Sequence, residues 1–243
     1  MDNAITAALS RQMVLTRALE TTANNVANQT TAGYKSDSVR FREYLAFVEP
    51  DASGDPIVSL VSDPDTVTNH EAGAVTQTFR DMDFAIDGDG FFAIETTSGV
   101  RYTRAGSFVV DADGELVTRS GARVLDEAQS PITIDPEAGP LAVAPDGELQ
   151  QGGAAVGRLG VFRFEDLRTL RKAGDTLFAA ADEPAVAQAP RVRQGFLEQS
   201  NVNPVAAMTD MIEIMRAYEQ AASLADTADE LARRAVETLS ANA

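Results

Sequence analysis

The sequence contains no cysteine and only one histidine, His70. The first absence excludes disulfides, thiolate nucleophiles and zinc–cysteine sites, and the second excludes a histidine-rich metal site or a pair of histidines acting as acid and base. No apolar run reaches the ~18 residues that a membrane-spanning helix needs. The first basic residue is Arg11, with no apolar segment after it, so the sequence predicts neither membrane insertion nor a cleaved signal peptide.

Basic residues are also scarce, because 20 Lys and Arg face 37 Asp and Glu, for a formal net charge of −17. A nucleic-acid-binding protein needs a basic surface to replace the counterions of the phosphates, and docking on anionic lipid needs basic residues too. The charge therefore argues against both functions. Apolar residues make up 44% of the chain, which is enough for a hydrophobic core and argues against a disordered acidic tail.

Proline and glycine, which interrupt helices, are missing from both ends of the chain. Residues 1–32 and 205–243 contain neither, while nine of the ten prolines lie between Pro50 and Pro190. This distribution predicts a long helix at each end and a centre divided by turns.

Four segments follow from this division. Residues 1–35 are predicted to form an N-terminal helix, 36–75 an extended connector, 76–203 a β-rich domain, and 204–243 a C-terminal helix that pairs with the N-terminal one. The predicted fold class is α+β, with the long N- and C-terminal helices forming a coiled-coil-like layer around a central antiparallel β-rich domain.

Each predicted helix carries residues at coiled-coil spacing. The seam of the first helix consists of Ile5, Leu9, Gln12, Thr16, Leu19, Ala23 and Val26. The second helix has one seam of Ile214, Ala217, Ala221, Leu224, Ala228, Leu231 and Ala235, and another of Met211, Met215, Tyr218, Ala222 and Ala225. Two adjacent seams predict contact with other chains; the alternative is packing on the β domain of the same chain. Asn203 is placed to cap this helix, with Pro204 at its first position.

The centre is predicted to be antiparallel β structure, because short apolar runs alternate with turn sequences. The apolar runs are Phe84–Ile86, Phe91–Ile94, Phe108–Val110, Leu116–Val117, Leu141–Val143 and Val161–Phe164, and the turns are Asp87–Gly90, Asp111–Gly114 and Pro145–Gly147. No helical pattern alternates with these strands, so a parallel βαβ sheet is not expected.

Several short patterns resemble catalytic or binding sites, and each has a simpler explanation. Gly88–Ala93 matches a dinucleotide-binding fingerprint, but strand-like residues follow where a helix should begin, so a β-turn is favoured. Asp111–Gly114 resembles the front of a calcium loop without its later ligands, so a turn is favoured again. Asp81 and Asp83 could act as the carboxylate pair of a glycosidase, although such pairs are expected by composition alone in so acidic a chain. His70 has no neighbouring residue in the sequence that would mark a nucleophile–base pair. The sequence therefore predicts no catalytic, cofactor-binding or metal-binding residue.

Polar residues near the end of the first helix have two possible roles. Asn24, Asn25 and Asn28 either fix the register of a helical seam or terminate the helix. Gly33 is predicted to adopt a positive φ as the C-cap of this helix.

Three stretches together resemble the bacterial flagellar rod and hook proteins. The N-terminal stretch is Asn24-Asn25-Val26-Ala27-Asn28 followed by Thr30, Thr31, Gly33, Tyr34 and Lys35. The central stretch is Asp83 to Phe92 with Tyr102 to Phe108, and the C-terminal stretch is Gln194 to Asn203 leading into Met208, Met211-Ile212 and Arg216-Ala217-Tyr218-Glu219. They occur in the family's order, and Asp81-Met82 stands where many relatives have Pro-Leu.

This resemblance implies a structural subunit of the flagellar basal-body rod, most like a proximal-rod member, that assembles with its own copies and other rod proteins and transmits torque. It implies export to the periplasm by the flagellar type III apparatus, with no cofactor and no enzymatic activity. With the helix seams, it implies an assembly interface of Ile5, Leu9, Leu19, Asn25, Val26, Asn28, Gly33, Met211, Met215, Tyr218, Leu224 and Leu231. The alternatives are a distal-rod or hook-type axial subunit, another self-assembling fibre or adhesin, or a secreted β-rich hydrolase using Asp pairs.

Overall fold

The computed structural model describes residues 2–45, 59–174 and 176–241. They fall into two compact units. The helical unit comprises Met1–Ala27, Asp37–Asn69 and Asn203–Ala243, and the β unit comprises Asn28–Ser36 and His70–Val202. The chain passes between the units four times, after Ala27, Ser36, Asn69 and Val202.

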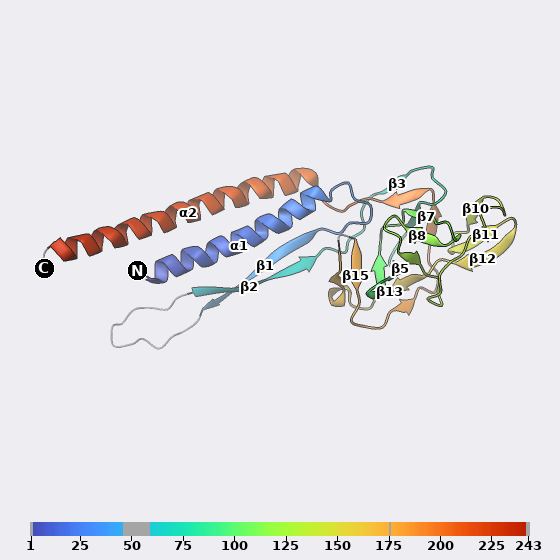
Figure 1. Ribbon diagram of the computed structural model, residues 1–243, viewed down its shortest axis with the longest axis horizontal. Coiled ribbons are helices and arrows are strands. Elements are labelled where there is room, and N and C mark those ends of the chain that lie inside the picture. The colour runs from blue at the N-terminus through green and yellow to red at the C-terminus, as the bar shows by residue number, and fades with distance from the viewer. Residues whose placement is uncertain (1, 46–58, 175, 242–243) are drawn as a thin grey trace. The chain divides into compact units, whose positions relative to one another are not determined.

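The helical unit contains two helices and one hairpin. Its elements are α1 (Asp2–Ala27), β1 (Asp37–Leu45), β2 (Ser59–Thr68) and α2 (Pro204–Ala241). The two strands pair antiparallel, with a register shift between Arg40 and Arg42. α1 contacts both α2 and the hairpin (Figure 1). Both strands lie within residues 36–75, the segment predicted to be an extended connector.

Polar side chains fix two ends of these helices. Asn203 Oδ1 accepts hydrogen bonds from the backbone N–H groups of Val205 and Ala206, at 3.1 and 3.2 Å, so the predicted N-cap of α2 is confirmed. Near the end of α1, the Asn25 side chain donates to Asp37 O at 2.7 Å and accepts from Asp37 N at 2.9 Å. Asn25 therefore ties the last turn of α1 to the first residue of β1.

The β unit is built from antiparallel strands. Its largest sheet has nine strands and includes the order β14-β15-β6-β5-β9-β8-β7, with β13 beside β5 and β16 beside β13. Smaller sheets are β10-β11-β12, β17-β4 and β18-β3. The bounds are β3 Val75–Gln77, β4 Phe84–Ile86, β5 Phe91–Thr96, β6 Gly99–Thr103, β7 Phe108–Val110, β8 Leu116–Thr118, β9 Arg123–Val124, β10 Leu141–Val143, β11 Glu148–Gln151, β12 Ala154–Arg158, β13 Val161–Arg163, β14 Arg171–Lys172, β15 Leu177–Ala179, β16 Ala185–Val186, β17 Val192–Gln194 and β18 Phe196–Glu198, with one 3₁₀ turn, Leu167–Thr169.

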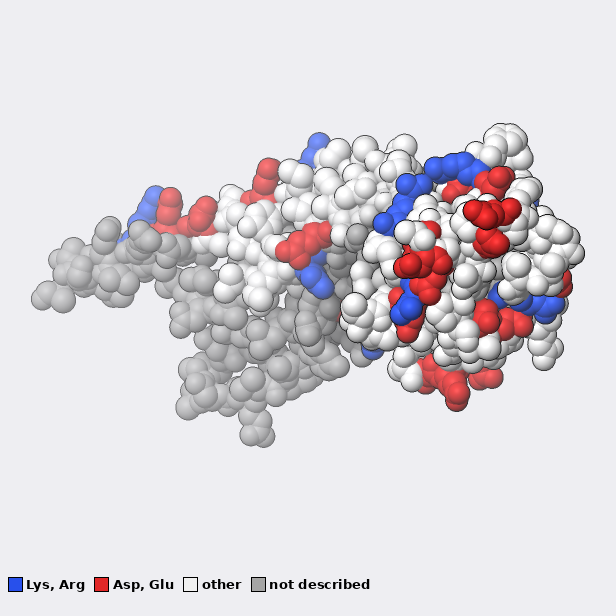
Figure 2. Space-filling view, turned by 45° about the vertical axis from the view of Figure 1, so that its right-hand side comes forward, with Lys and Arg blue, Asp and Glu red and all other residues white. Residues whose placement is uncertain are grey.

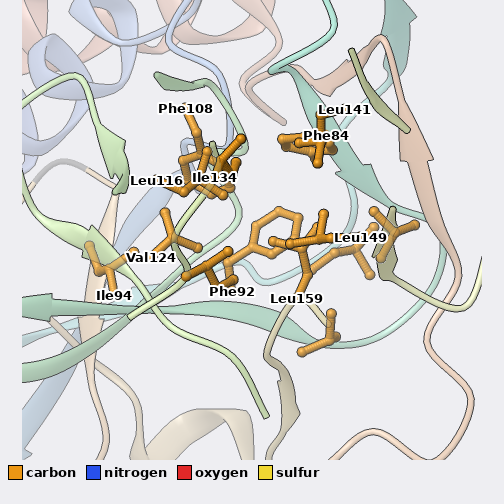
Figure 3. Close-up of a cluster of buried hydrophobic side chains, with 14 of the residues drawn as sticks. Phe84, Phe92, Ile94, Phe108, Leu116, Val124, Ile134, Leu141, Leu149 and Leu159 are labelled. Atoms are coloured by element: carbon orange, nitrogen blue, oxygen red, sulfur yellow. The ribbon is translucent and has the colours of Figure 1, made fainter. Parts of the chain in front are cut away.

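The core of the β unit lies between these sheets, as the close-up in Figure 3 shows. Phe84 and Phe92 are fully buried, and both rings pack against Phe108, with centroids 5.9 and 5.4 Å away. β4 and the first four residues of β5 are buried on both faces, which explains why their sequences are continuous apolar runs rather than alternating ones. The turn residues Asp87–Gly90 separate the two strands as predicted.

The predicted fold class is wrong about the coiled-coil layer. The described chain is mostly antiparallel β structure, and its two α-helices share their unit with the β1–β2 hairpin. The buried side chains on the facing helices include the small residues Ala18, Ala207 and Ala221. Small residues let helices approach closely, so over the residues whose burial is described α1 and α2 do not bury the heptads of larger residues that a coiled coil would.

Replacing Phe92 with alanine is expected to destabilise the β unit by about 3–5 kcal/mol, because a fully buried ring leaves a cavity that the surrounding strands cannot fill. Denaturant unfolding followed by circular dichroism measures the change. Val109→Ala is the matched control, since Val109 follows the core residue Phe108 in β7 but is 40% exposed. A loss at Phe92 within the ~0.5 kcal/mol typical of surface substitutions would contradict this core.

Candidate functional site

One face of α2 exposes apolar side chains. These side chains recur at spacings of three and four residues, and all of them are exposed: Val205, Met208, Ile212, Met215 and Tyr218. Met208, Ile212 and Met215 are each about half exposed, at 48%, 52% and 47%. Figure 2 shows Asp and Glu gathered in patches on the β unit, while much of the described surface of the helices is uncharged. Within this chain, α2 therefore has an apolar stripe that its own unit does not cover.

The residues predicted for an assembly interface lie in different environments. Leu9, Met215, Tyr218 and Leu224 are exposed; Leu19, Val26, Asn28 and Met211 are half-buried; Asn25 and Gly33 are buried. The side chains of Ile5 and Leu231 lie outside the described residues. Exposed members remain available to a neighbouring chain, whereas Asn25 and Gly33 already serve contacts inside their own units.

The predicted helix seams are displaced from the observed buried stripes. On α1, Leu9, Thr16 and Ala23 are exposed, while Ala18 and Asn25 are buried. On α2, Ile214, Ala217 and Ala221 do face inward, but Leu224 is 63% exposed. Sequence reasoning did not include Val205, Met208 and Ile212 in a seam. Their spacing with Met215 is the signal that would have identified this stripe.

The β unit contains a buried cluster of charges, called here the ionic junction: Lys35, Arg104 and Glu198. The Lys35 ammonium bonds one oxygen of the Glu198 carboxylate, and Arg104 Nη1 bonds the other at 3.1 Å. The side chains of Lys35 and Glu198 are 0% and 1% exposed, and that of Arg104 is 6% exposed. Buried charges are retained in proteins when they are paired in this way.

Further hydrogen bonds complete the junction. Lys35 Nζ donates to Glu71 O at 2.6 Å, and Arg104 Nη2 donates to Gly88 O at 2.8 Å. Glu198 Oε1 also accepts from Gly73 N at 3.1 Å. Each charged group therefore meets polar backbone as well as its ionic partner, which offsets part of the cost of removing it from water.

Burial has the largest influence on both cations. It lowers the pKa of Lys35, an effect that the Glu198 carboxylate opposes and the positive charge of Arg104 reinforces. It also lowers the pKa of Arg104, with Glu198 and Asp89 opposing the change. Glu198 is the shared counterion of Lys35 and Arg104, so both cations would be buried without a negative partner if this carboxylate were lost.

Hydrogen bonds from backbone N–H groups hold residues 33–36 against residues 198–201, next to the ionic junction. Gly33 N donates to Glu198 O at 2.8 Å, and Ser36 N donates to Asn201 Oδ1 at 2.7 Å. Gly33 has a φ of +71°, and a Cβ there would lie 2.2 Å from Ala105 N. The predicted positive φ is confirmed, but its predicted role as a helix cap is wrong, because α1 ends at Ala27. Gly33 is required by close packing on residues 104–105.

The junction unites the three stretches that carry the family resemblance. Lys35 belongs to the N-terminal stretch, Arg104 to the central one and Glu198 to the C-terminal one. Sequence reasoning identified the stretches but did not predict that they meet. Each stretch contributes one charged residue to the junction, but Lys35 and Glu198 are 163 residues apart, and a pairing at that separation has no local signature in the sequence.

The residues considered for catalysis have other partners or roles. Asp83 is buried and pairs with Arg80, whose Nε lies 3.0 Å from Asp83 Oδ2. Asp111 accepts hydrogen bonds from the backbone of Asp113 and Glu115, as in a turn. Asp166, which the sequence analysis did not single out, is hydrogen-bonded by Arg168, and this contact holds the pKa of its carboxyl at about 2, the opposite of what a general acid needs. Gly88–Ala93 is a turn followed by β5, which does not fit the dinucleotide fingerprint.

Two further features are absent from the described part of the chain. No group of three or more His, Cys, Asp or Glu residues is placed to hold a metal ion. None of the described helices is both long and apolar enough to cross a membrane.

Three family models match the chain, each over one of the stretches that meet at the ionic junction. The model described as "Flagella basal body rod protein" matches residues 5–35. "Flagellar hook protein FlgE/F/G D1 domain" matches 85–151, and "Flagellar basal body rod FlgEFG protein C-terminal" matches 193–238.

Curated relatives match almost the whole chain. The flagellar basal-body rod protein FlgF of Caulobacter vibrioides is 44% identical over 241 residues, with 98% of each chain covered. FlgF of Mesorhizobium japonicum is 36% identical over 242 residues, again with 98% of each chain covered. FlgG of Bacillus subtilis is 32% identical over 246 residues, covering 90% of this chain and 92% of FlgG. The resemblance inferred from the sequence is confirmed.

Gly33→Ala is expected to destabilise the β unit by more than the roughly 1–2 kcal/mol that a left-handed backbone costs an alanine, because its Cβ would also overlap the Ala105 backbone. Gly121→Ala is the matched control, since Gly121 has a φ of +84° and open space around its Cβ position. Thermal unfolding of the two variants measures the difference. Equal losses would show that the contact with Ala105 is unimportant.

Glu198→Gln keeps the side-chain shape but removes the carboxylate, so two buried cations lose their counterion. We expect a loss of about 3–5 kcal/mol in the free energy of unfolding. Adding Lys35→Met removes one of the unpaired cations and is expected to recover part of this loss. Glu183→Gln, at an exposed position, is the control. If Lys35→Met gave only an additive further loss, Lys35 and Glu198 would not be coupled.

Proposed function

Because the chain belongs to the flagellar basal-body rod protein family, whose members are structural subunits of the rod, we propose that it assembles in the proximal part of the rod with its own copies and other rod subunits. The observation that carries this proposal is the apolar stripe on α2. Met208, Ile212 and Met215 lie on one helix face and are about half exposed. Such a stripe is costly in water and is typical of a surface that a partner covers.

The charge distribution supports contact through the ends of the chain. Residues 1–35 carry a net charge of +1 and residues 204–243 carry −4, out of −17 for the whole chain. Contacts between copies through these two terminal segments therefore meet less repulsion than contacts through residues 36–203, which carry −14. Exposed Leu9 and Leu224 extend the apolar surface of the two helices, and we assign them to the same assembly contacts.

The role we propose is mechanical. A rod subunit contacts neighbours through different patches, so torque is distributed over many heterologous interfaces. We assign no catalytic residue, and we propose export through the flagellar type III apparatus to the periplasmic space.

A distal-rod position is the second candidate. The similarity to FlgG of Bacillus subtilis, over 90% of this chain, favours it. The higher identity to FlgF of Caulobacter vibrioides, 44% against 32%, favours the FlgF position. Localisation of the labelled subunit within isolated basal bodies separates the two.

Met215→Asp and Leu224→Asp are each expected to block incorporation into the rod, because a charge in a dry helical interface costs several kcal/mol. The purified variants should keep the thermal transition of the β unit, since both side chains are exposed in the single chain. The measurements are a melting curve and a count of basal bodies with complete rods in cells that express only the variant.

Gln220→Asp is the matched control, because it adds the same charge at an exposed polar position of α2. It should leave rod completion intact. Complete rods and motile cells with both Met215→Asp and Leu224→Asp would refute a subunit interface on this helix. A collapsed melting transition with both would instead place the helix in the core of the β unit.

A further inference from the structure

Phe79 combines two unfavourable properties. Its side chain is 81% exposed, more than any other large apolar side chain whose burial is described. Its φ is +58°, and among the described residues other than glycine only Gln129 also has a positive φ. An aromatic side chain gains nothing from either property in an isolated chain. Local strain of this kind is found where the surroundings enforce a functional geometry.

The surrounding turn holds Phe79 firmly in this conformation. The backbone N–H groups of Thr78 and Phe79 both donate to Gly195 O, at 2.7 and 3.3 Å. On the other side, Arg80 Nε pairs with buried Asp83, whose backbone N–H donates to Arg80 O at 3.2 Å. The ring is therefore presented outward from a rigid turn, which lowers the entropy lost when it binds a partner.

A cavity beside Phe79 is lined by two arginines, although the chain is acidic. The next residue, Arg80, lines this cavity of about 540 Å³ together with Arg119, and none of its described lining residues is Asp or Glu. Arg119 Nε donates to the Ser107 hydroxyl at 3.0 Å. Arg119 belongs to none of the described ion pairs. A partner that accepts Phe79 should therefore carry acidic groups around an apolar pocket.

A cavity elsewhere on the β unit has this chemistry. It measures about 610 Å³ and shares no residue with the first, and its apolar walls include Phe164, Val186 and Pro190. Asp87, Asp89 and Glu165 are its acidic residues, and Arg163 and Arg191 its basic ones. Arg163 is already paired with Asp89 at 3.2 Å, so the lining carries one excess negative charge.

We propose that Phe79 of one copy inserts into this second cavity, lined by residues 87–89, 163–165 and 185–191, on the next copy of the same chain. Arg119, which lines the same cavity as Arg80 and is in no described ion pair, would then approach the acidic rim that Asp87 and Glu165 provide. Since the inserted ring and the receiving cavity are different patches of one chain, the contact can repeat without closing into a dimer. The inference rests on the proposed function, in which copies of the chain meet in the rod.

The absence of cysteine from the chain makes disulfide cross-linking a direct test. A chain with both Phe79→Cys and Ala189→Cys is placed in cells, and isolated basal bodies are oxidised. We expect linked copies that separate on reduction, while each single variant gives none. The control pairs Phe79→Cys with Val156→Cys, an exposed position outside the cavity, and should give no linked copies.

Loss of the ring could itself reduce incorporation, so a second measurement keeps an aromatic group at position 79. p-Benzoylphenylalanine there should photo-cross-link to residues 185–191 of another copy, identified by mass spectrometry. Phe79→Ala is expected to weaken association between copies on the order of tenfold or more, as for other buried aromatic anchors.

The outcomes separate this inference from the proposed function. Complete rods that contain the chain but show no link between position 79 and this cavity overturn the contact and leave the rod assignment standing. Cross-links to a different rod protein also overturn it. Absence of the wild-type chain from isolated rods overturns the proposed function itself.

Discussion

The contact of Glu198 with Lys35 and Arg104 is the interaction on which the β unit depends. Both cations bind the carboxylate, and the cluster is almost completely excluded from water and supported by backbone carbonyl groups, while the buried Arg104 Nε has no hydrogen-bond partner among the described residues. Breaking one partner of such a cluster leaves an unpaired buried charge, whereas surface ion pairs contribute little. The glycine at position 33 serves the same arrangement, because any larger residue there would separate residues 33–36 from residues 104–105.

The sequence predicted local features better than distant ones. Asp87–Gly90 and Asp111–Gly114 were recognised as turns because glycine and aspartate have preferences that act within four residues. The start of α2 was also predictable, since Asn203 and Pro204 suit an N-cap and a first helical position. The ionic junction was not, because a local pattern assigns Lys, Arg and Glu to the surface unless their partners are known.

The helix seams show a different limit of sequence reasoning. Heptad spacing identifies which residues share a face, but several faces of α1 and α2 carry apolar residues. Ala18 and Ala221 are buried, whereas Leu9 and Leu224 are exposed, because close approach favours small side chains. The β1–β2 hairpin also covers α1, and nothing in residues 1–35 indicates that. The apolar stripe on α2 is what remains after these contacts are made.

The four passages of the chain between its two units have a mechanical consequence. Residues 28–36 are anchored in the β unit by Lys35 and Gly33, although the residues on both sides of them belong to the helical unit. A twisting load applied to one unit therefore reaches the other through four covalent connections in parallel. Each connection therefore bears only a share of that load.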